Sequence, residues 1–148
     1  MSTLERYLNN PNAYYIKVGV EPHEYKCHKM IYNLEKFNVP QIYHYDKEQK
    51  IMVIQKIHGS NIADFYGEDS ENTPSEIFEE IRYIITELYK INIYYPDITG
   101  YNFIQDKFTK KLWICDFEHV KCLSRFPKEL SFIKEFINGK NEWNPEFK

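Results

Sequence analysis

The chain has 148 residues, of which 43% are hydrophobic and 28% are charged, and its net charge at pH 7 is −3. A chain of this length buries roughly 70% of the surface that it exposes when unfolded, so we expect one domain over residues 1–148 and not a disordered chain. Basic and acidic residues are interspersed and no apolar run is long enough to cross a bilayer, so we expect neither a nucleic acid nor a membrane as a partner.

The first elements expected along the chain form a strand-rich unit with one helix. Residues 14–20 combine aromatic and β-branched side chains, which favour a strand. Residues 21–37 repeat apolar side chains at helical spacing, with Pro22 in the first turn, where proline is tolerated. Residues 41–45 and 51–57 then predict two strands joined by a polar turn.

The remaining elements are mainly helical. The longest predicted helix covers residues 75–91, where isoleucine and leucine form one apolar stripe and Ser75 occupies the position of a capping residue. Shorter helices are predicted at residues 62–66 and about 127–138, and a second hairpin at residues 101–105 and 112–115. This order of elements predicts an α+β fold with a strand-rich front and a helical back.

Three polar residues follow one another at a spacing that points to chemistry. Asp97 comes shortly after the longest helix, and Asn102 follows it five residues later. Asp116 ends a predicted strand nineteen residues after Asp97 and is followed by Phe117. Each residue alone fits a turn, a cap or a strand end. Together, in this order, they resemble the catalytic loop and the metal-binding Asp of the protein-kinase-like superfamily.

The resemblance runs from about Tyr14 to His119 and implies a two-lobed kinase-like fold. The N-lobe, about residues 1–57, would be reduced, because only sixteen residues precede Lys17 and none of them is the glycine that the family's phosphate-covering hairpin requires. The C-lobe, about residues 58–148, would be helical and truncated.

The resemblance also implies roles for the three polar residues. Asp116 would hold the Mg²⁺ or Mn²⁺ ion that bridges the phosphates of ATP, and Asn102 would hold a second ion. Asp97 would be the catalytic residue, which orients the acceptor hydroxyl and accepts its proton.

Two more residues are implied as nucleotide-binding. Lys17 ends the first predicted strand and would contact the phosphates, supported by a glutamate from the next helix. Glu24 is the best candidate for that glutamate, because its helix position faces back toward the strand. Counting back from Pro40 places the family's glutamate nearer Cys27, and a solvated surface position is the ordinary alternative for Glu24.

Some residues depart from the family pattern. Tyr95 and Pro96 stand where His and Arg are usual, and Glu118 replaces the usual Gly after Asp-Phe. Asp-Phe-Glu is similar to the motif of choline kinases and aminoglycoside phosphotransferases. Glu118 would either face the metal or pair with Lys121 on the surface, and we slightly favour the surface pair.

Three functions remain open. The foremost is an ATP- and magnesium-dependent phosphotransferase, a minimal Ser/Thr protein kinase. The second is a weak or inactive kinase-like module that acts through a partner protein, and the third is a small-molecule kinase of the choline or aminoglycoside type. Only 29 residues follow His119, too few for the usual substrate platform, so we expect a protein partner or protein substrate. An uncovered stripe on the helix at 75–91 would allow a homodimer through the C-lobe.

The cysteines and the first residues indicate the compartment. Cys27, Cys115 and Cys122 are odd in number and widely spaced, which is typical of reduced intracellular thiols. Residues 1–6 lack the layout of a signal peptide. We therefore expect a cytoplasmic protein, in the host cytoplasm if the source is a virus.

Overall fold

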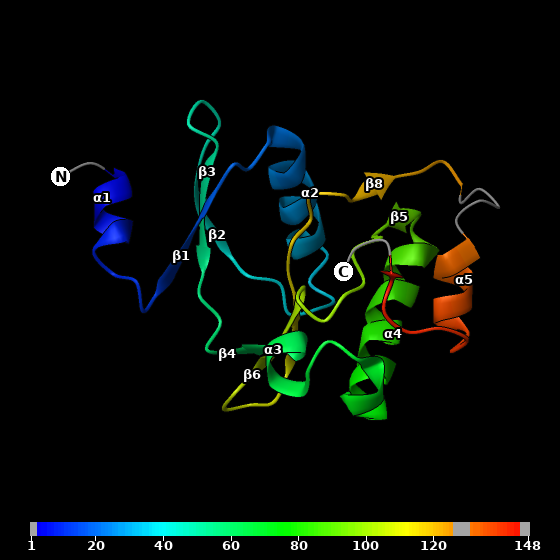
Figure 1. The fold of residues 1–148 in the computed structure, drawn as a ribbon. Coiled ribbons are helices and arrows are strands. Elements are labelled where there is room, and N and C mark those ends of the chain that lie inside the picture. The colour runs from blue at the N-terminus through cyan, green and yellow to red at the C-terminus, as the bar shows by residue number, and fades with distance from the viewer. Residues whose placement is uncertain (1–2, 126–130, 146–148) are drawn as a thin grey trace.

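The structure, a computed structural model, describes residues 3–125 and 131–145 (Figure 1). The N-terminal part of these residues contains the helices α1 (Thr3–Leu8) and α2 (Pro22–Asn33) and the strands β1 (Tyr14–Val18), β2 (Ile42–Asp46) and β3 (Ile51–Gln55). The strands form an antiparallel sheet in the order β1-β3-β2. In Figure 1, α2 lies between this sheet and the long helix α4 (Ser75–Lys90).

The sheet is organised around β3. Met52, Val53 and Ile54 of β3 are buried, as expected for a central strand with a neighbour on each side. β1 pairs with β3 in a register that sets Lys17 opposite Met52. This register fixes the point along β3 beside which the Lys17 side chain projects from the sheet.

The C-terminal part of the described residues contains α3 (Ile62–Tyr66), the 3-10 turn η1 (Ser70–Asn72), α4 (Ser75–Lys90) and α5 (Ser131–Ile137). Its strands are β4 (Gly59–Asn61), β5 (Ile93–Tyr94), β6 (Phe103–Asp106), β7 (Leu112–Ile114) and β8 (Lys121–Cys122). They pair in antiparallel fashion in the orders β4-β6-β7 and β5-β8. None of the helices in the described ranges combines the length and the apolar character that crossing a membrane requires.

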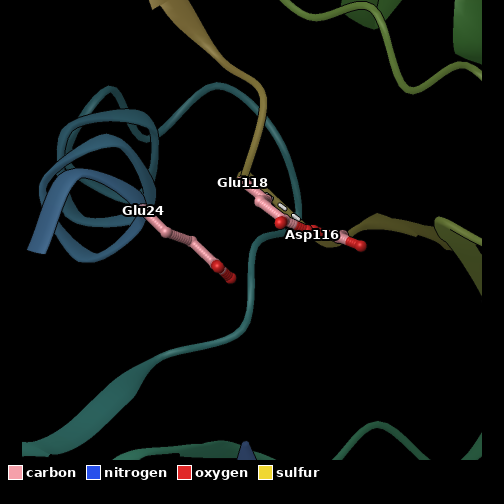
Figure 2. Close-up of side chains that lie close together, drawn as sticks. All are labelled: Glu24, Asp116 and Glu118. Atoms are coloured by element: carbon pink, nitrogen blue, oxygen red, sulfur yellow. Dashed lines mark hydrogen bonds between the residues drawn. The ribbon is translucent and has the colours of Figure 1, made fainter. Parts of the chain in front are cut away.

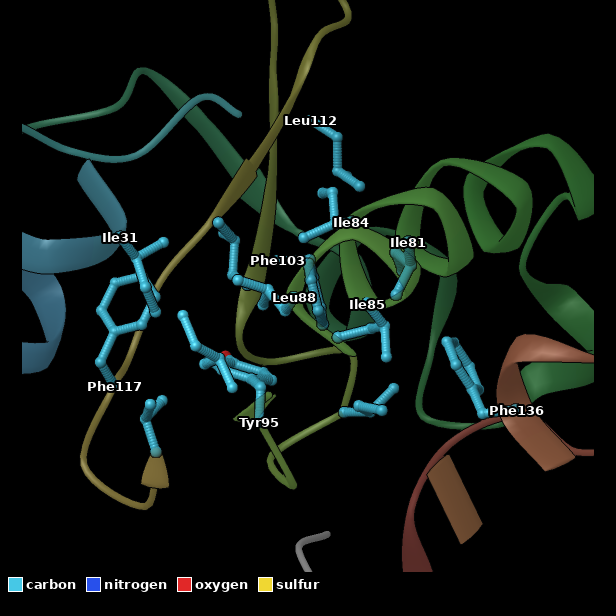
Figure 3. Packing of buried hydrophobic residues seen from close by; sticks show 14 of the residues in the cluster. Ile31, Ile81, Ile84, Ile85, Leu88, Tyr95, Phe103, Leu112, Phe117 and Phe136 are labelled. Carbon is cyan, nitrogen blue, oxygen red and sulfur yellow. The ribbon is translucent and has the colours of Figure 1, made fainter. Parts of the chain in front are cut away.

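The main core is built on the apolar face of α4, as Figure 3 shows. Its fully or almost fully buried members include Ile81, Ile85, Leu88, Phe103, Phe117 and Phe136. α5 lies beside α4 and contributes Phe136 (Figure 1). Within the described residues the apolar side chains of α4 are covered by this core, whereas Ile91, just after the helix, is 41% exposed. A homodimer through the C-terminal part remains a prediction.

Several boundaries differ from the predictions for local reasons. The helix predicted to reach residue 37 ends at Asn33, because Glu35 adopts a positive φ of 55° that turns the chain. Ser75 does not cap α4 but is its first residue, and Pro74 holds the capping position. The strands β4, β5 and β8 are not predicted, because two or three residues are too few to show the alternation of apolar and polar side chains that is typical of a strand. Residues 127–130 of the predicted last helix lie outside the described residues.

Gly59→Ala should destabilise this fold. A Cβ atom at Gly59 would lie 2.0 Å from the carbonyl oxygen of Gln105, so β4 and β6 would have to separate. Overpacking of this kind costs about 1–3 kcal/mol of the free energy of unfolding, which thermal unfolding would show as a lower melting temperature. Ser60→Ala, at the next and exposed position of β4, is the matched control. Equal melting temperatures for the two variants would contradict the prediction.

Candidate functional site

A pocket of about 380 Å³ lies where the sheet β1-β3-β2 meets the sheet β4-β6-β7. Lys17, Asn102 and Asp116 line it together with apolar side chains such as Ile54 and Ile104. A larger hollow of about 710 Å³ lies between α4 and the turn from β6 to β7, and its lining includes none of the predicted site residues. The chemistry of the lining, and not the volume, therefore identifies the smaller pocket as the candidate site.

The side chain of Lys17 links β1 to α2 and to the segment after β7. Its Nζ atom forms an ion pair with Glu24 and lies 3.5 Å from Oδ1 of Asp116. The Glu24 side chain is 5% exposed, and a buried carboxylate is costly without a partner of opposite charge. Burial favours the uncharged amine, yet the pKa of Lys17 is raised, because Glu24 and Asp116 together outweigh burial. Burial is the largest influence on Glu24 and raises the pKa of its carboxyl in spite of Lys17.

Asp116 follows β7 in a left-handed backbone conformation with a φ of 61°, which Asp tolerates better than most residues. The peptide before it is fixed by two hydrogen bonds. The N–H of Cys115 donates to the carbonyl of Asn102 at 2.9 Å, and the hydroxyl of Tyr95 donates to the carbonyl of Cys115. Tyr95 is itself buried against Phe117. Tyr95 thus anchors the backbone next to Asp116.

The loop that carries Asp97 is held through its backbone. Nδ2 of Asn102 donates to the carbonyl of Asp97 at 2.9 Å. The buried Asn144 donates through Nδ2 to the carbonyl of Pro96 and through its N–H to that of Ile98, both at 2.8 Å. Because Asn102 uses its amide hydrogen in this way, its amide oxygen remains for a cation.

The carboxylate of Asp97 is directed at His119, which the sequence patterns did not single out as a site residue. Nδ1 of His119 lies 2.7 Å from Oδ2 and 2.9 Å from Oδ1 of Asp97. Burial raises the pKa of the Asp97 carboxyl, and the hydrogen bond to His119 opposes this rise. The same bond raises the pKa of the His119 imidazole. The two residues are 22 positions apart, so no local pattern could have identified the pair.

Three carboxylates form a cluster beside Lys17. One oxygen atom each of Glu24, Asp116 and Glu118 lies within 4.8 Å of the other two, and Figure 2 shows Glu24 reaching from α2 toward the segment that carries Asp116 and Glu118. Carboxylate oxygens suit Mg²⁺. Asp116 lines the pocket and Glu24 does not, so Asp116 is the carboxylate of this cluster best placed to hold an ion there. The Glu118 side chain is 62% exposed, and both of its expected roles remain predictions.

The five predicted site residues lie in one region of the molecule. Lys17, Glu24 and Asp116 are in direct contact, and Asn102 lines the same pocket. Asp97 is joined to Asn102 through its carbonyl, while its carboxylate points to His119 and is not part of the pocket lining. The solvated alternative for Glu24 is wrong, because this residue is 4% exposed. The chemical roles of the five residues remain predictions.

Lys17→Met should destabilise the protein more at alkaline than at acidic pH. Without Lys17, the buried Glu24 must stay charged without a partner or take up a proton, and protonation becomes more costly as pH rises. The carboxyl pKa of Glu24 is already raised in the folded state, so the stability that its proton contributes is lost as pH rises through that pKa. Breaking a buried pair costs up to about 3–5 kcal/mol.

Chemical denaturation at an acidic and at an alkaline pH measures this effect. Lys50→Met is the matched control, because it breaks the exposed pair with Glu21 and should change little at either pH. A penalty for Lys17→Met that does not depend on pH would contradict the role assigned to Glu24.

No protein-family model matches the chain, and no curated protein matches it. A similar fold occurs in a solved structure, that of the kinase PK-1 of the Cydia pomonella granulovirus, with a TM-score of 0.56 and 15% sequence identity. The match covers 82% of this chain and 57% of PK-1, so the chain spans little more than half the length of that kinase. An identity this low concerns the fold alone. The chain therefore has a kinase-like fold of helices and antiparallel sheets.

Proposed function

We propose that the protein is a phosphotransferase that uses ATP with Mg²⁺ or Mn²⁺ and acts on a serine or threonine hydroxyl of a protein. The observation that carries the proposal is the convergence of Lys17, Asn102 and Asp116 on one pocket. A cation, an amide oxygen and a carboxylate supply positive charge for phosphates and hard oxygen ligands for magnesium. The kinase-like fold supports the proposal at the coarser level of phosphoryl transfer.

The base and the phosphates of a nucleotide each have a counterpart in the pocket. Apolar side chains such as Ile54 and Ile104 suit the flat face of a base. Lys17, held in place by Glu24, would meet the phosphates. Asp116 and Asn102 would hold the metal ion, which neutralises negative charge on the phosphates when it is bound.

Asp97 would act on the acceptor. In the transfer, the acceptor oxygen bonds to the γ-phosphorus, the bond from that phosphorus to the oxygen of ADP breaks, and the hydroxyl proton passes to the Asp97 carboxylate. Catalysis of this kind depends on the position of the groups more than on covalent chemistry. The backbone bonds from Asn102 and Asn144 hold the main chain around Asp97 in place.

A second candidate is a nucleotide-binding module without turnover that acts through a partner protein. β1 is an edge strand, and within the described residues no strand lies beyond it to cover the phosphate side of the pocket. Fewer backbone amides would then meet the phosphates. The sequence Asp116-Phe117-Glu118 favours a third candidate function, a kinase that acts on the hydroxyl of a small molecule.

Mg-ATP should raise the melting temperature of the wild-type protein. A ligand at a hundred times its Kd stabilises the native state by about 2.7 kcal/mol. ATP with a chelator should give a smaller rise, and Asp116→Asn should remove the difference between the two conditions, because it removes the carboxylate assigned to the metal. Asp69→Asn, at an exposed position outside the pocket lining, is the matched control and should respond as the wild type does. No rise in the wild type at millimolar Mg-ATP would contradict nucleotide binding.

Asp97→Asn should abolish most of the transfer and leave nucleotide binding intact. Loss of a general base lowers a rate by about 10²- to 10⁴-fold. Transfer of labelled phosphate from ATP to a generic protein acceptor measures the rate, and the melting shift with Mg-ATP measures binding in the same preparation. Equal transfer by the wild type and the variant would rule out the role of Asp97. A melting shift without transfer by the wild type would instead favour the nucleotide-binding module.

A further inference from the structure

The contact between Asp97 and His119 joins two segments that are far apart in the sequence. Asp97 lies in the loop after β5, and His119 lies between β7 and β8. Within residues 3–125 and 131–145, both hydrogen bonds to the Asp97 carboxylate come from Nδ1 of His119, at 2.7 and 2.9 Å. The Asp97 side chain is 5% exposed, whereas that of His119 is 49% exposed. His119 therefore connects a buried carboxylate with the surface.

The backbone bonds described above fix the main chain of Asp97 but leave the direction of its carboxylate open. A carboxylate turns about two side-chain torsions, and a donor at one fixed point selects one orientation. The N–H of a histidine ring satisfies part of the accepting capacity of the carboxylate and leaves other lone pairs for a hydroxyl. A single donor of this kind can orient Asp97 without blocking it.

His119 is held firmly enough to serve as that donor. Phe117 and Val120, which flank the dipeptide Glu118-His119 in the same turn, are fully buried. The N–H of Val120 donates to the carbonyl of Phe117 at 3.3 Å, which closes the turn. The carbonyl of Val120 in turn contacts Nε2 of His23 on α2 at 2.7 Å. Packing and hydrogen bonds around a supporting residue are what keep a functional group in its productive geometry.

We infer that His119 is a positioning residue, which holds the Asp97 carboxylate in the orientation that receives the proton of the acceptor hydroxyl. This inference rests on the proposed function. His119 is not among the residues that line the nucleotide pocket. Its removal should therefore slow transfer without weakening the binding of Mg-ATP.

The test compares two substitutions that differ in one property. His119→Leu keeps much of the side-chain volume and removes the donor, and His119→Asn keeps an amide N–H near the place of Nδ1. Misplacement of a reacting group costs a rate up to about 10²-fold, so kcat of His119→Leu should fall by about 10- to 100-fold. His119→Asn should recover most of that loss.

The KM for Mg-ATP and the melting shift with Mg-ATP should match the wild type in both variants. His58→Leu, at an exposed histidine outside the pocket lining, is the matched control.

Each other outcome overturns the inference. A kcat of His119→Leu that equals the wild type would show that Asp97 needs no donor, and a higher kcat would show that the ring obstructs the acceptor. Equally slow Leu and Asn variants would assign His119 a role other than hydrogen bonding. A wild type that binds Mg-ATP and transfers nothing would overturn both the proposed function and this inference, whereas a transferring wild type separates the two.

Discussion

The burial of Glu24 is the constraint on which the arrangement of the candidate site depends. A carboxylate removed from water loses several kcal/mol of solvation, and a nearby cation must offset the loss. Lys17 is that cation, and it also reaches Asp116. The pairing ties α2, β1 and the segment after β7 to one another. A slip of one residue in the pairing of β1 with β3 would turn Lys17 to the other face of the sheet and leave Glu24 without its partner.

The core of the C-terminal part holds the backbone of the candidate site in the same way at three places. Asp97, Asn102 and Asp116 are each followed directly by a side chain that is fully buried in the main cluster, namely Ile98, Phe103 and Phe117. Neighbouring side chains in an extended or turning chain point in different directions. A buried apolar residue therefore anchors the backbone next to each of the three polar residues. Close packing in the cluster leaves little freedom for any of the three anchors to move independently.

The helices and site residues that can be predicted from the sequence are those whose residues recur at a characteristic spacing. The helix at residues 62–66 is confirmed at both ends, and α4 departs from its predicted range by one residue. The spacing of Asp97, Asn102 and Asp116 predicts one site; Asn102 and Asp116 line one pocket, and Asp97 contacts Asn102 through its carbonyl. The partners that position Asp97 could not be predicted, because His119 is 22 residues away and Asn144 approaches Pro96 from a distance of 48 positions. A periodic stripe shows which face of α4 is apolar, but it cannot show that α5 covers that face.

The contact between Asn144 and the Asp97 loop has a consequence for synthesis of the protein. Ribosomes add about 5–20 residues per second, so Asn144 is made roughly 2–10 seconds after Pro96, since the two are 48 positions apart. During that interval the nascent chain already contains Asp97, Asn102 and Asp116 but lacks the amide that closes the loop over the carbonyls of Pro96 and Ile98. The candidate site is therefore completed late, after the ribosome has passed α5, and a chain that ends before Asn144 carries the three residues without this support.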